Sequence, residues 1–108
     1  MDTVYQLKIT LKHSQPPIWR RILVRANINL HDLHRVIQVV MGWTNSHLHQ
    51  FFVHGIYYGD DDPDFGLESE REFICEHEIG LDQIVSQEKE KFIYEYDFGD
   101  SWEHQIVV

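Results

Sequence analysis

The stretch Tyr94–Gln105, YEYDFGDSWEHQ, concentrates chemically active side chains near the end of the chain, with four acidic residues, four aromatic residues and one histidine around a single glycine. Two further histidines lie two positions apart in another stretch, so both would project to the same face of a strand. Histidine and carboxylate ligands suit zinc, iron or manganese, and an open coordination position would make such a site catalytic. The candidate metal ligands are therefore His47, His49, Asp97, Asp100 and His104.

A structural hairpin is the competing interpretation of the same stretch. Its aromatic residues alternate with other residues before Gly99, as on a strand with one buried face, and the residues after Asp100 alternate too. A Gly-Asp pair between two such runs favours a tight turn. On this interpretation, which we prefer, the aromatic residues pack in the core and no cofactor is expected; a divalent metal is the alternative.

Other catalytic patterns are absent from the sequence. The triplet DFG at Asp97–Gly99 binds magnesium in kinases, but only together with a Gly-rich loop, a strand lysine and a catalytic loop, which these 108 residues lack. There is also no serine elbow, P-loop or dinucleotide-binding glycine pattern. His31 and His34 lie three positions apart on an expected helix, where structural packing is the simpler role. The sequence favours a protein that is not an enzyme and leaves the metal-dependent alternative open.

Charge is distributed unevenly along an acidic chain. The net charge is −9, yet residues 1–54 carry six Lys and Arg against two Asp and Glu, whereas residues 55–108 carry three against sixteen. An acidic domain is a poor general binder of nucleic acid, because affinity for phosphate comes from clustered Lys and Arg. Nucleic acid stays open as a partner only through a local basic face that comprises Arg20, Arg21, Arg25 and Arg35.

The composition predicts a single folded domain, 1–108, in the cytoplasm. No apolar run approaches the roughly 20 residues that a membrane-spanning helix requires, and no signal-peptide pattern follows Met1. Cys75 is the single cysteine and cannot form an internal disulfide, which is typical of a reducing compartment. We therefore expect no membrane partner, while a protein partner and the oligomeric state stay open.

Alternating patterns predict the strands that would position these side chains. VYQLKITLK at 4–12 alternates apolar and polar residues, and IWRRILV at 18–24 follows after two prolines, which suggests a hairpin. Two more strands, joined at Gly55, are predicted in the segment HLHQFFVHGIYYGD. The last two strands are predicted in KFIYEYDF and WEHQIVV. The acidic segment DDDPDFGLESE is expected to be a solvated loop, and GLDQIV a short helical turn.

A helix is predicted from about Leu30 to Met41, where the apolar period changes to three and four residues. Asn29 suits an N-cap, and Gly42 suits a left-handed C-terminal stop. The order strand-strand-helix-strand-strand-turn-strand-strand predicts an α+β fold, in which one main helix packs across one face of a mostly antiparallel sheet. This order is β-grasp-like, which is an analogy of fold and carries no function.

Four strings together resemble one family. The chain resembles the plasmid open-reading-frame family named for the hairy-root-inducing Ri plasmid. The resemblance lies in the strings PPIWRRILV, LHDLHRVIQVVMGWTNSHLHQF, YGD and EYDFGDSWEHQI. Members of this family are also described as transposon passenger proteins of the TnpR type. The similarity extends from Tyr5 to Ile106, and the combination of strings makes it specific. The residues that match the family's motifs are Trp19, Arg20, Trp43, Tyr58, Gly59, Tyr96, Asp97, Gly99, Asp100, Trp102 and His104.

The resemblance implies a cytoplasmic microbial protein with a β-rich α+β fold that is associated with mobile genetic elements. It implies no particular activity, substrate or cofactor. Members commonly continue past the last strand into a segment with Cys, Pro and Gly, so we expect the domain 1–108 to lack that tail. The leading hypothesis is a non-catalytic protein-interaction module. The alternatives are a metal-dependent hydrolase-like enzyme with the His/Asp site, and a nucleic-acid accessory factor that uses the basic strand and helix.

Overall fold

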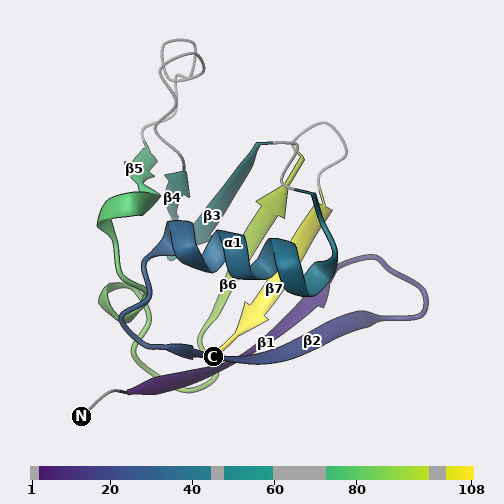
Figure 1. The fold of residues 1–108 in the computed structure, drawn as a ribbon, viewed down its shortest axis with the longest axis horizontal. Coiled ribbons are helices and arrows are strands. Elements are labelled where there is room, and N and C mark those ends of the chain that lie inside the picture. The colour runs from purple at the N-terminus through teal and green to yellow at the C-terminus, as the bar shows by residue number, and fades with distance from the viewer. Residues whose placement is uncertain (1–2, 45–47, 60–72, 98–101) are drawn as a thin grey trace.

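One long helix lies across one face of a sheet in the computed structural model, which describes residues 3–44, 48–59, 73–97 and 102–108 (Figure 1). Within these residues the sheet has seven strands in the order β2-β1-β7-β6-β3-β4-β5. The strands are β1 (Val4–Leu11), β2 (Ile18–Arg25), β3 (His49–Val53), β4 (Ile56–Gly59), β5 (Phe73–Cys75), β6 (Lys91–Tyr96) and β7 (Trp102–Val107). The helix is α1 (Leu30–Met41), and two 3-10 turns follow β5, η1 (Glu76–Glu78) and η2 (Leu81–Gln83).

This arrangement confirms the predicted α+β class. Neighbouring strands pair antiparallel except β4 and β5, which are parallel. The first strand lies beside the last one, because β1 pairs with both β2 and β7. The β-grasp assignment is not confirmed by this sheet.

The helix α1 begins and ends where the sequence predicts. The Asn29 side chain accepts a hydrogen bond from the Asp32 N–H at 2.8 Å, and Gly42 ends the helix with a φ of 79°, which glycine adopts freely. The apolar stripe faces the sheet, where Leu33 and Ile37 are fully buried. Among the described residues, no helix is long and apolar enough to cross a membrane.

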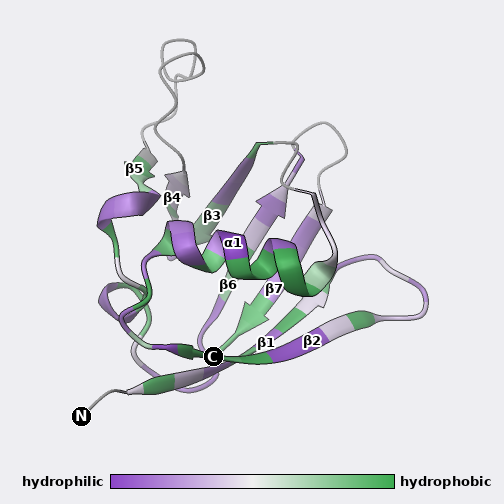
Figure 2. Ribbon diagram, viewed as in Figure 1, coloured by the Kyte–Doolittle hydropathy of each residue, from purple (hydrophilic) through white to green (hydrophobic). Residues whose placement is uncertain are grey.

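The hydrophobic core lies between α1 and the inner face of the sheet. Inner-face side chains of four strands, Ile9, Phe51, Tyr94 and Ile106, are all fully buried. Their neighbours along each strand point away from the core and are more exposed, because successive side chains of a strand alternate between the two faces. Figure 2 shows the resulting mixture of apolar (green) and polar (purple) residues along α1 and the strands.

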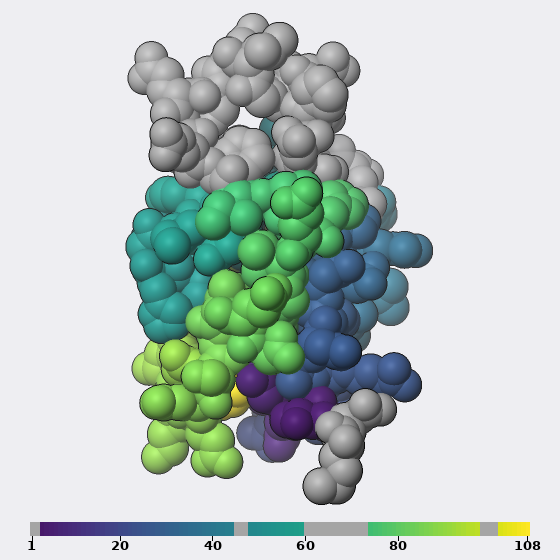
Figure 3. Space-filling model, turned by 90° about the vertical axis from the view of Figure 1, so that its left-hand side faces the viewer, coloured from purple at the N-terminus to yellow at the C-terminus, as the bar shows by residue number. Residues whose placement is uncertain are grey.

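The opposite face of the sheet is not covered by any described element, and we call it the uncovered face. The register of β1 and β2 places Lys8 beside Arg21, and Thr10 beside Trp19, on this face. In the side view of Figure 3, α1 (blue) and the strands β3 and β4 (teal) lie on opposite sides of the segment that holds η1 and η2 (green). The sheet therefore has one face that forms the core and one that is open.

The segment after β5 was not predicted as part of the core, and it closes one side of it. Its backbone is fixed to the chain around the start of α1, because Leu30 N–H donates to the Ile79 carbonyl at 3.0 Å and Leu81 N–H donates to the Ile28 carbonyl at 2.8 Å. These bonds hold η1 against α1 and bring Glu76 beneath the helix. Elements of three residues are too short to show a period in the sequence.

Candidate functional site

The Tyr94 side chain lies at the centre of the polar groups beneath α1. It is fully buried on the inner face of β6. Its hydroxyl accepts a hydrogen bond from Gln38 Nε2 at 2.8 Å and lies 2.6 Å from His34 Nδ1. With the Gln38 amide as donor, the hydroxyl keeps its own proton to donate to His34. Because His34 and Gln38 occupy successive turns of α1, this one hydroxyl joins the helix to the middle of the sheet.

Burial decides the protonation of this tyrosine. Removal from water raises the pKa of the Tyr94 hydroxyl far above its ordinary value, the Gln38 hydrogen bond opposes this increase, and the charge of Glu76 reinforces it. The hydroxyl is therefore neutral at physiological pH. It acts as a hydrogen-bonding group and not as a base or nucleophile.

A fully buried carboxylate, Glu76 of η1, lies beside this network. One of its oxygens is 2.5 Å from Nε2 of His49 on β3, and the other is 3.2 Å from Nδ1 of His31 on α1. Burying a carboxylate is costly unless donors compensate for the lost water, and the two imidazoles supply those donors. Glu76 thus connects three elements, η1, β3 and the first turn of α1.

Stacked histidine rings complete this cluster. His34 lies face to face with His49, with 3.4 Å between ring centroids and 6° between ring planes, and His31 stacks on His77 at 4.0 Å. Two histidines therefore contact the buried carboxylate of Glu76, and two more stack on those two rings.

The tautomer of His104 follows from its two partners. Trp43 Nε1 can only donate, and it does so to His104 Nε2 at 3.1 Å, so the ring proton is on Nδ1, which donates to the Tyr94 carbonyl at 3.1 Å. Burial lowers the pKa of His104 below its ordinary value, although backbone hydrogen bonds partly oppose the shift. His104 is neutral, and both of its nitrogens are engaged in hydrogen bonds.

Three of the five candidate metal ligands, His49, Asp97 and His104, belong to the described residues, while His47 and Asp100 lie outside them. The His49 and His104 rings flank the Tyr94 ring, at 6.0 Å and 5.3 Å between centroids. Asp97 follows β6, and its N–H donates to the Leu48 carbonyl at 2.8 Å. Within the described part of the chain, no three His, Cys, Asp or Glu side chains form a group that could hold a metal ion. The metal site remains a prediction, because two of its ligands are not described.

Several family-motif residues form an aromatic group at one end of the core. The Trp43 ring lies 5.5 Å from that of Tyr96, 5.7 Å from that of Trp102 and 6.1 Å, edge-on, from that of His104. Aromatic pairs prefer such tilted arrangements, and each pair stabilises by about 0.5–1.5 kcal/mol beyond burial of area. This group supports the interpretation of these residues as structural.

The remaining motif residues are spread over the fold. Tyr58 and Gly59 belong to β4, where Tyr58 is buried, whereas Trp19 and Arg20 are exposed on β2. Gly99, in the turn of the predicted hairpin, lies outside the described residues. The motif residues therefore do not converge on one site within the described part of the chain.

Sequence reasoning missed the residues that hold the buried cluster together, Glu76 and Gln38. Gln38 had a detectable signal, since it lies four positions after His34 and so shares a helix face with it. Glu76 had none, because it lies 27 residues from His49 and 45 residues from His31.

Replacing the central hydroxyl tests its structural role. Tyr94→Phe should lower the free energy of unfolding by about 1–3 kcal/mol, because two buried groups on α1 lose their shared partner. Tyr57→Phe, at a half-buried tyrosine on β4, is the matched control and should have a smaller effect, because removing a hydroxyl costs less where water can reach its partners. Urea titrations of both variants measure the effects, and equal effects would contradict the role given to Tyr94.

The lowered pKa of His104 predicts a loss of stability in mild acid. In the unfolded chain this histidine takes up a proton near its ordinary pKa of 6.5, while the buried ring resists protonation. The unfolded state then binds more protons, so stability falls as pH drops below 6.5, by at most about 1.4 kcal/mol per pH unit for one group. His104→Gln should show a shallower dependence between pH 7.5 and pH 5.5 in the same titrations, and an unchanged slope would refute this assignment.

The chain is similar in sequence to a longer curated protein. An uncharacterized protein of Sinorhizobium fredii, y4hQ, is 38% identical over 109 residues, which cover 98% of this chain and 53% of the relative. The chain thus spans about half the length of this curated relative.

A solved structure has the same fold. The crystal structure of MM3350, a protein of unknown function from Methanosarcina mazei Go1, matches with a TM-score of 0.87 and 31% identity over all of this chain and 60% of that one. The family model for the plasmid pRiA4b ORF-3-like proteins matches residues 3–108. On this match and the y4hQ identity, the chain belongs to the plasmid pRiA4b ORF-3-like family.

Proposed function

We propose that this chain is a non-catalytic protein-interaction domain that binds through the uncovered face of its sheet. The observation that supports this proposal most strongly is the exposure of apolar side chains on that face. Leu23 is 71% exposed, Val4 54% and Trp19 46%. Exposed apolar groups that gather on one face of a domain are typical of binding surfaces.

The uncovered face combines these apolar groups with cations in regular rows. The strand registers align Arg21 of β2, Lys8 of β1, Val107 of β7 and Lys91 of β6 in one row. The next row begins with Trp19 and reaches an aromatic pair on β3 and β4, Phe52 and Tyr57, whose rings are 4.7 Å apart. Aromatic residues and arginine are enriched at the centres of protein interfaces.

Trp19 has the features of an anchor residue. Lys8 Nζ lies 5.2 Å and the Arg21 guanidinium 5.5 Å from the centre of the Trp19 ring, within the range of cation–π attraction. These contacts restrict the ring before any partner arrives, which reduces the entropy lost on binding. Trp19 and its two cations are therefore the proposed centre of the interface.

The hydrolase-like alternative is less well supported. His49 and His104 are buried, and hydrogen bonds to Glu76, Trp43 and the Tyr94 carbonyl occupy them. A catalytic group must reach its substrate, and these side chains face the core. We therefore propose a structural role for the histidines and a binding role for the opposite face.

The setting of this function is also a proposal. The family name refers to a plasmid, which is consistent with a role beside mobile genetic elements, and the resemblance to transposon passenger proteins of the TnpR type points the same way. We propose a cytoplasmic location on the basis of the single cysteine, which cannot form an internal disulfide. Nucleic acid is a weaker candidate partner, since the net charge is −9.

A displayed library of random peptides tests the proposed function. The wild-type domain should enrich peptides whose binding is lost in the double variant Trp19→Ala, Leu23→Ser, because both side chains lie exposed on the uncovered face. Val39→Ser, at a residue of α1 that is 80% exposed, is the control and should retain binding. Failure to enrich any peptide, or equal loss in both variants, would count against a binding role for this face.

A further inference from the structure

The side chains of the uncovered face are ordered by charge. The antiparallel registers place the outward side chains of neighbouring strands in rows that run across the sheet. Successive rows are two residues, or about 7 Å, apart along each strand, because every second side chain points to the same face. Three adjacent rows differ in charge, and their order determines which surface can cover them.

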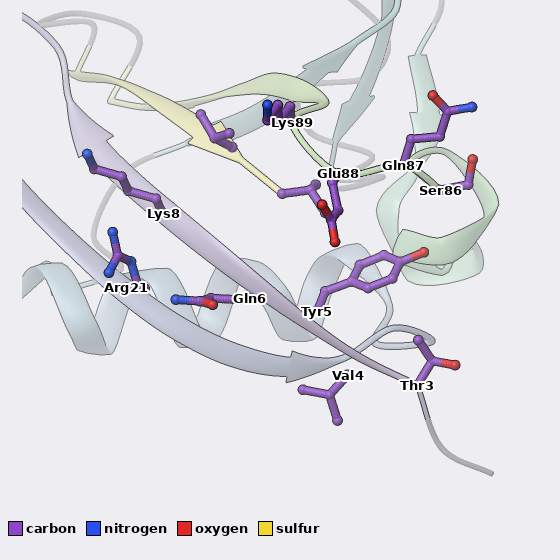
Figure 4. A pocket seen from close by; sticks show the side chains of 12 residues that line it. Thr3, Val4, Tyr5, Gln6, Lys8, Arg21, Ser86, Gln87, Glu88 and Lys89 are labelled. Carbon is purple, nitrogen blue, oxygen red and sulfur yellow. The ribbon is translucent and has the colours of Figure 1, made fainter.

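The first of these rows is basic and comprises Arg21, Lys8, Val107 and Lys91. Its three cations are exposed, and Figure 4 shows Lys8 and Arg21 along the same stretch of β1 and β2. In the part of the chain that the structure describes, none of the three forms an ion pair with a carboxylate. This basic row therefore presents three positive charges to a partner.

The middle row contains no charged residue, and we call it the uncharged row. It runs across six strands through Trp19, Thr10, Gln105, Ile93, Phe52 and Tyr57. Trp19 is 46% exposed at one end, and Phe52 is 37% exposed near the other. The uncharged row thus offers aromatic and apolar groups for burial between its two charged neighbours.

The third row is acidic and comprises Glu103, Glu95 and Gln50. Glu95 and Glu103 lie directly opposite each other on β6 and β7, and like charges in that position destabilise a sheet. Lys12 Nζ lies 3.5 Å from the Glu103 carboxylate, and Gln50 Nε2 donates to Glu95 at 2.7 Å. An exposed ion pair stabilises by at most about 1 kcal/mol, so a further cation facing this acidic row would be favourable.

This order of rows is complementary to itself. When a second copy is turned by 180° about an axis along the uncharged row, the two uncharged rows meet, and each basic row meets the acidic row of the other copy. A turn about an axis along the strands would instead bring basic row against basic row. In the favoured arrangement, Lys91 of one copy faces Glu95 of the other, because both residues belong to β6.

We propose that two copies of this chain associate through these three rows as a symmetric dimer, with their sheets about 10 Å apart. The inference rests on the proposed function and names a second copy of the chain as the partner of the uncovered face. The net charge of −9 on each copy opposes association, but salt screens charges that lie beyond a Debye length of about 8 Å. The facing rows meet directly, and each contact between them forms twice.

A second copy fits the uncovered face better than nucleic acid does. Phosphates on the basic row would lie about 14 Å along the strands from the carboxylates of the acidic row, and bases stacked on the uncharged row would bring the polyanion closer to them. Glu95 and Glu103 would then repel it. A second copy satisfies both charged rows at once.

Analytical ultracentrifugation of the chain tests the proposal. The wild-type protein should show a concentration-dependent equilibrium between monomer and dimer. Lys91→Glu or Glu95→Lys alone should weaken the association about tenfold or more, because each places like charges opposite each other at two places in the dimer. Arg35→Glu on α1 and Glu78→Lys on η1, at exposed residues of other surfaces, are controls with the same changes of charge and should leave the association intact.

A mixture of the two single variants provides the most specific readout. The Lys91→Glu chain and the Glu95→Lys chain each repel their own copies. In a mixed dimer, every side chain at positions 91 and 95 faces one of opposite charge, so the mixture should associate at least about tenfold more tightly than either variant alone. Only folded chains can restore the dimer in this way, so the same measurement controls for misfolding.

Three results would overturn the proposal. The first is a chain that stays monomeric up to about 1 mM, a concentration that populates even weak complexes. The second is a dimer that both single variants leave intact, or whose loss the mixture does not reverse. The third is binding of single-stranded oligothymidylate that Lys91→Glu abolishes and Glu95→Lys strengthens. Library peptides that depend on Trp19 and Leu23, combined with the first or second result, would refute the dimer and leave the proposed function standing.

Discussion

The hydroxyl of Tyr94 is a polar group that must find partners inside a hydrophobic core, and the arrangement of α1 over the sheet depends on this requirement. His34 and Gln38 satisfy it from two turns of the helix. A buried polar group without a partner costs about 1–3 kcal/mol, so a helix that slides or rotates on the sheet loses stability at once. In the described residues, no buried side-chain nitrogen or oxygen lacks a hydrogen bond, so the network under α1 specifies one packing of the core.

The two faces of the sheet differ in composition and exposure. Beneath α1, the buried side chains of His34, His49, Glu76, Tyr94 and His104 are joined by hydrogen bonds and ring contacts. Exposed apolar residues and cations gather on the other face, where no described element covers them. Substitutions on the exposed face can therefore leave the core undisturbed, because successive side chains of each strand point to opposite faces.

Local patterns predicted much of this fold. The caps of α1 and its apolar stripe depend on residues within a few positions of one another, and so do the alternating strands. The sheet order and the buried cluster depend on distant segments. His49 and His104 were recognised as chemically capable, but their partners, Glu76 and Trp43, lie 27 and 61 residues away. The residue types suggested metal ligands, whereas hydrogen-bond partners so distant in the sequence leave no local pattern.

The most direct test distinguishes a structural role of the buried histidines from metal binding. Nitrogen-15 NMR of the imidazole rings at pH 7 reports directly which ring nitrogen of His104 carries the proton and whether zinc changes it. We expect a neutral His104 with its proton on Nδ1, donated to the Tyr94 carbonyl, and ring signals of His49 and His104 that an equimolar addition of zinc leaves in place. Zinc-dependent shifts of the ring nitrogens of both histidines would contradict the structural role of this cluster.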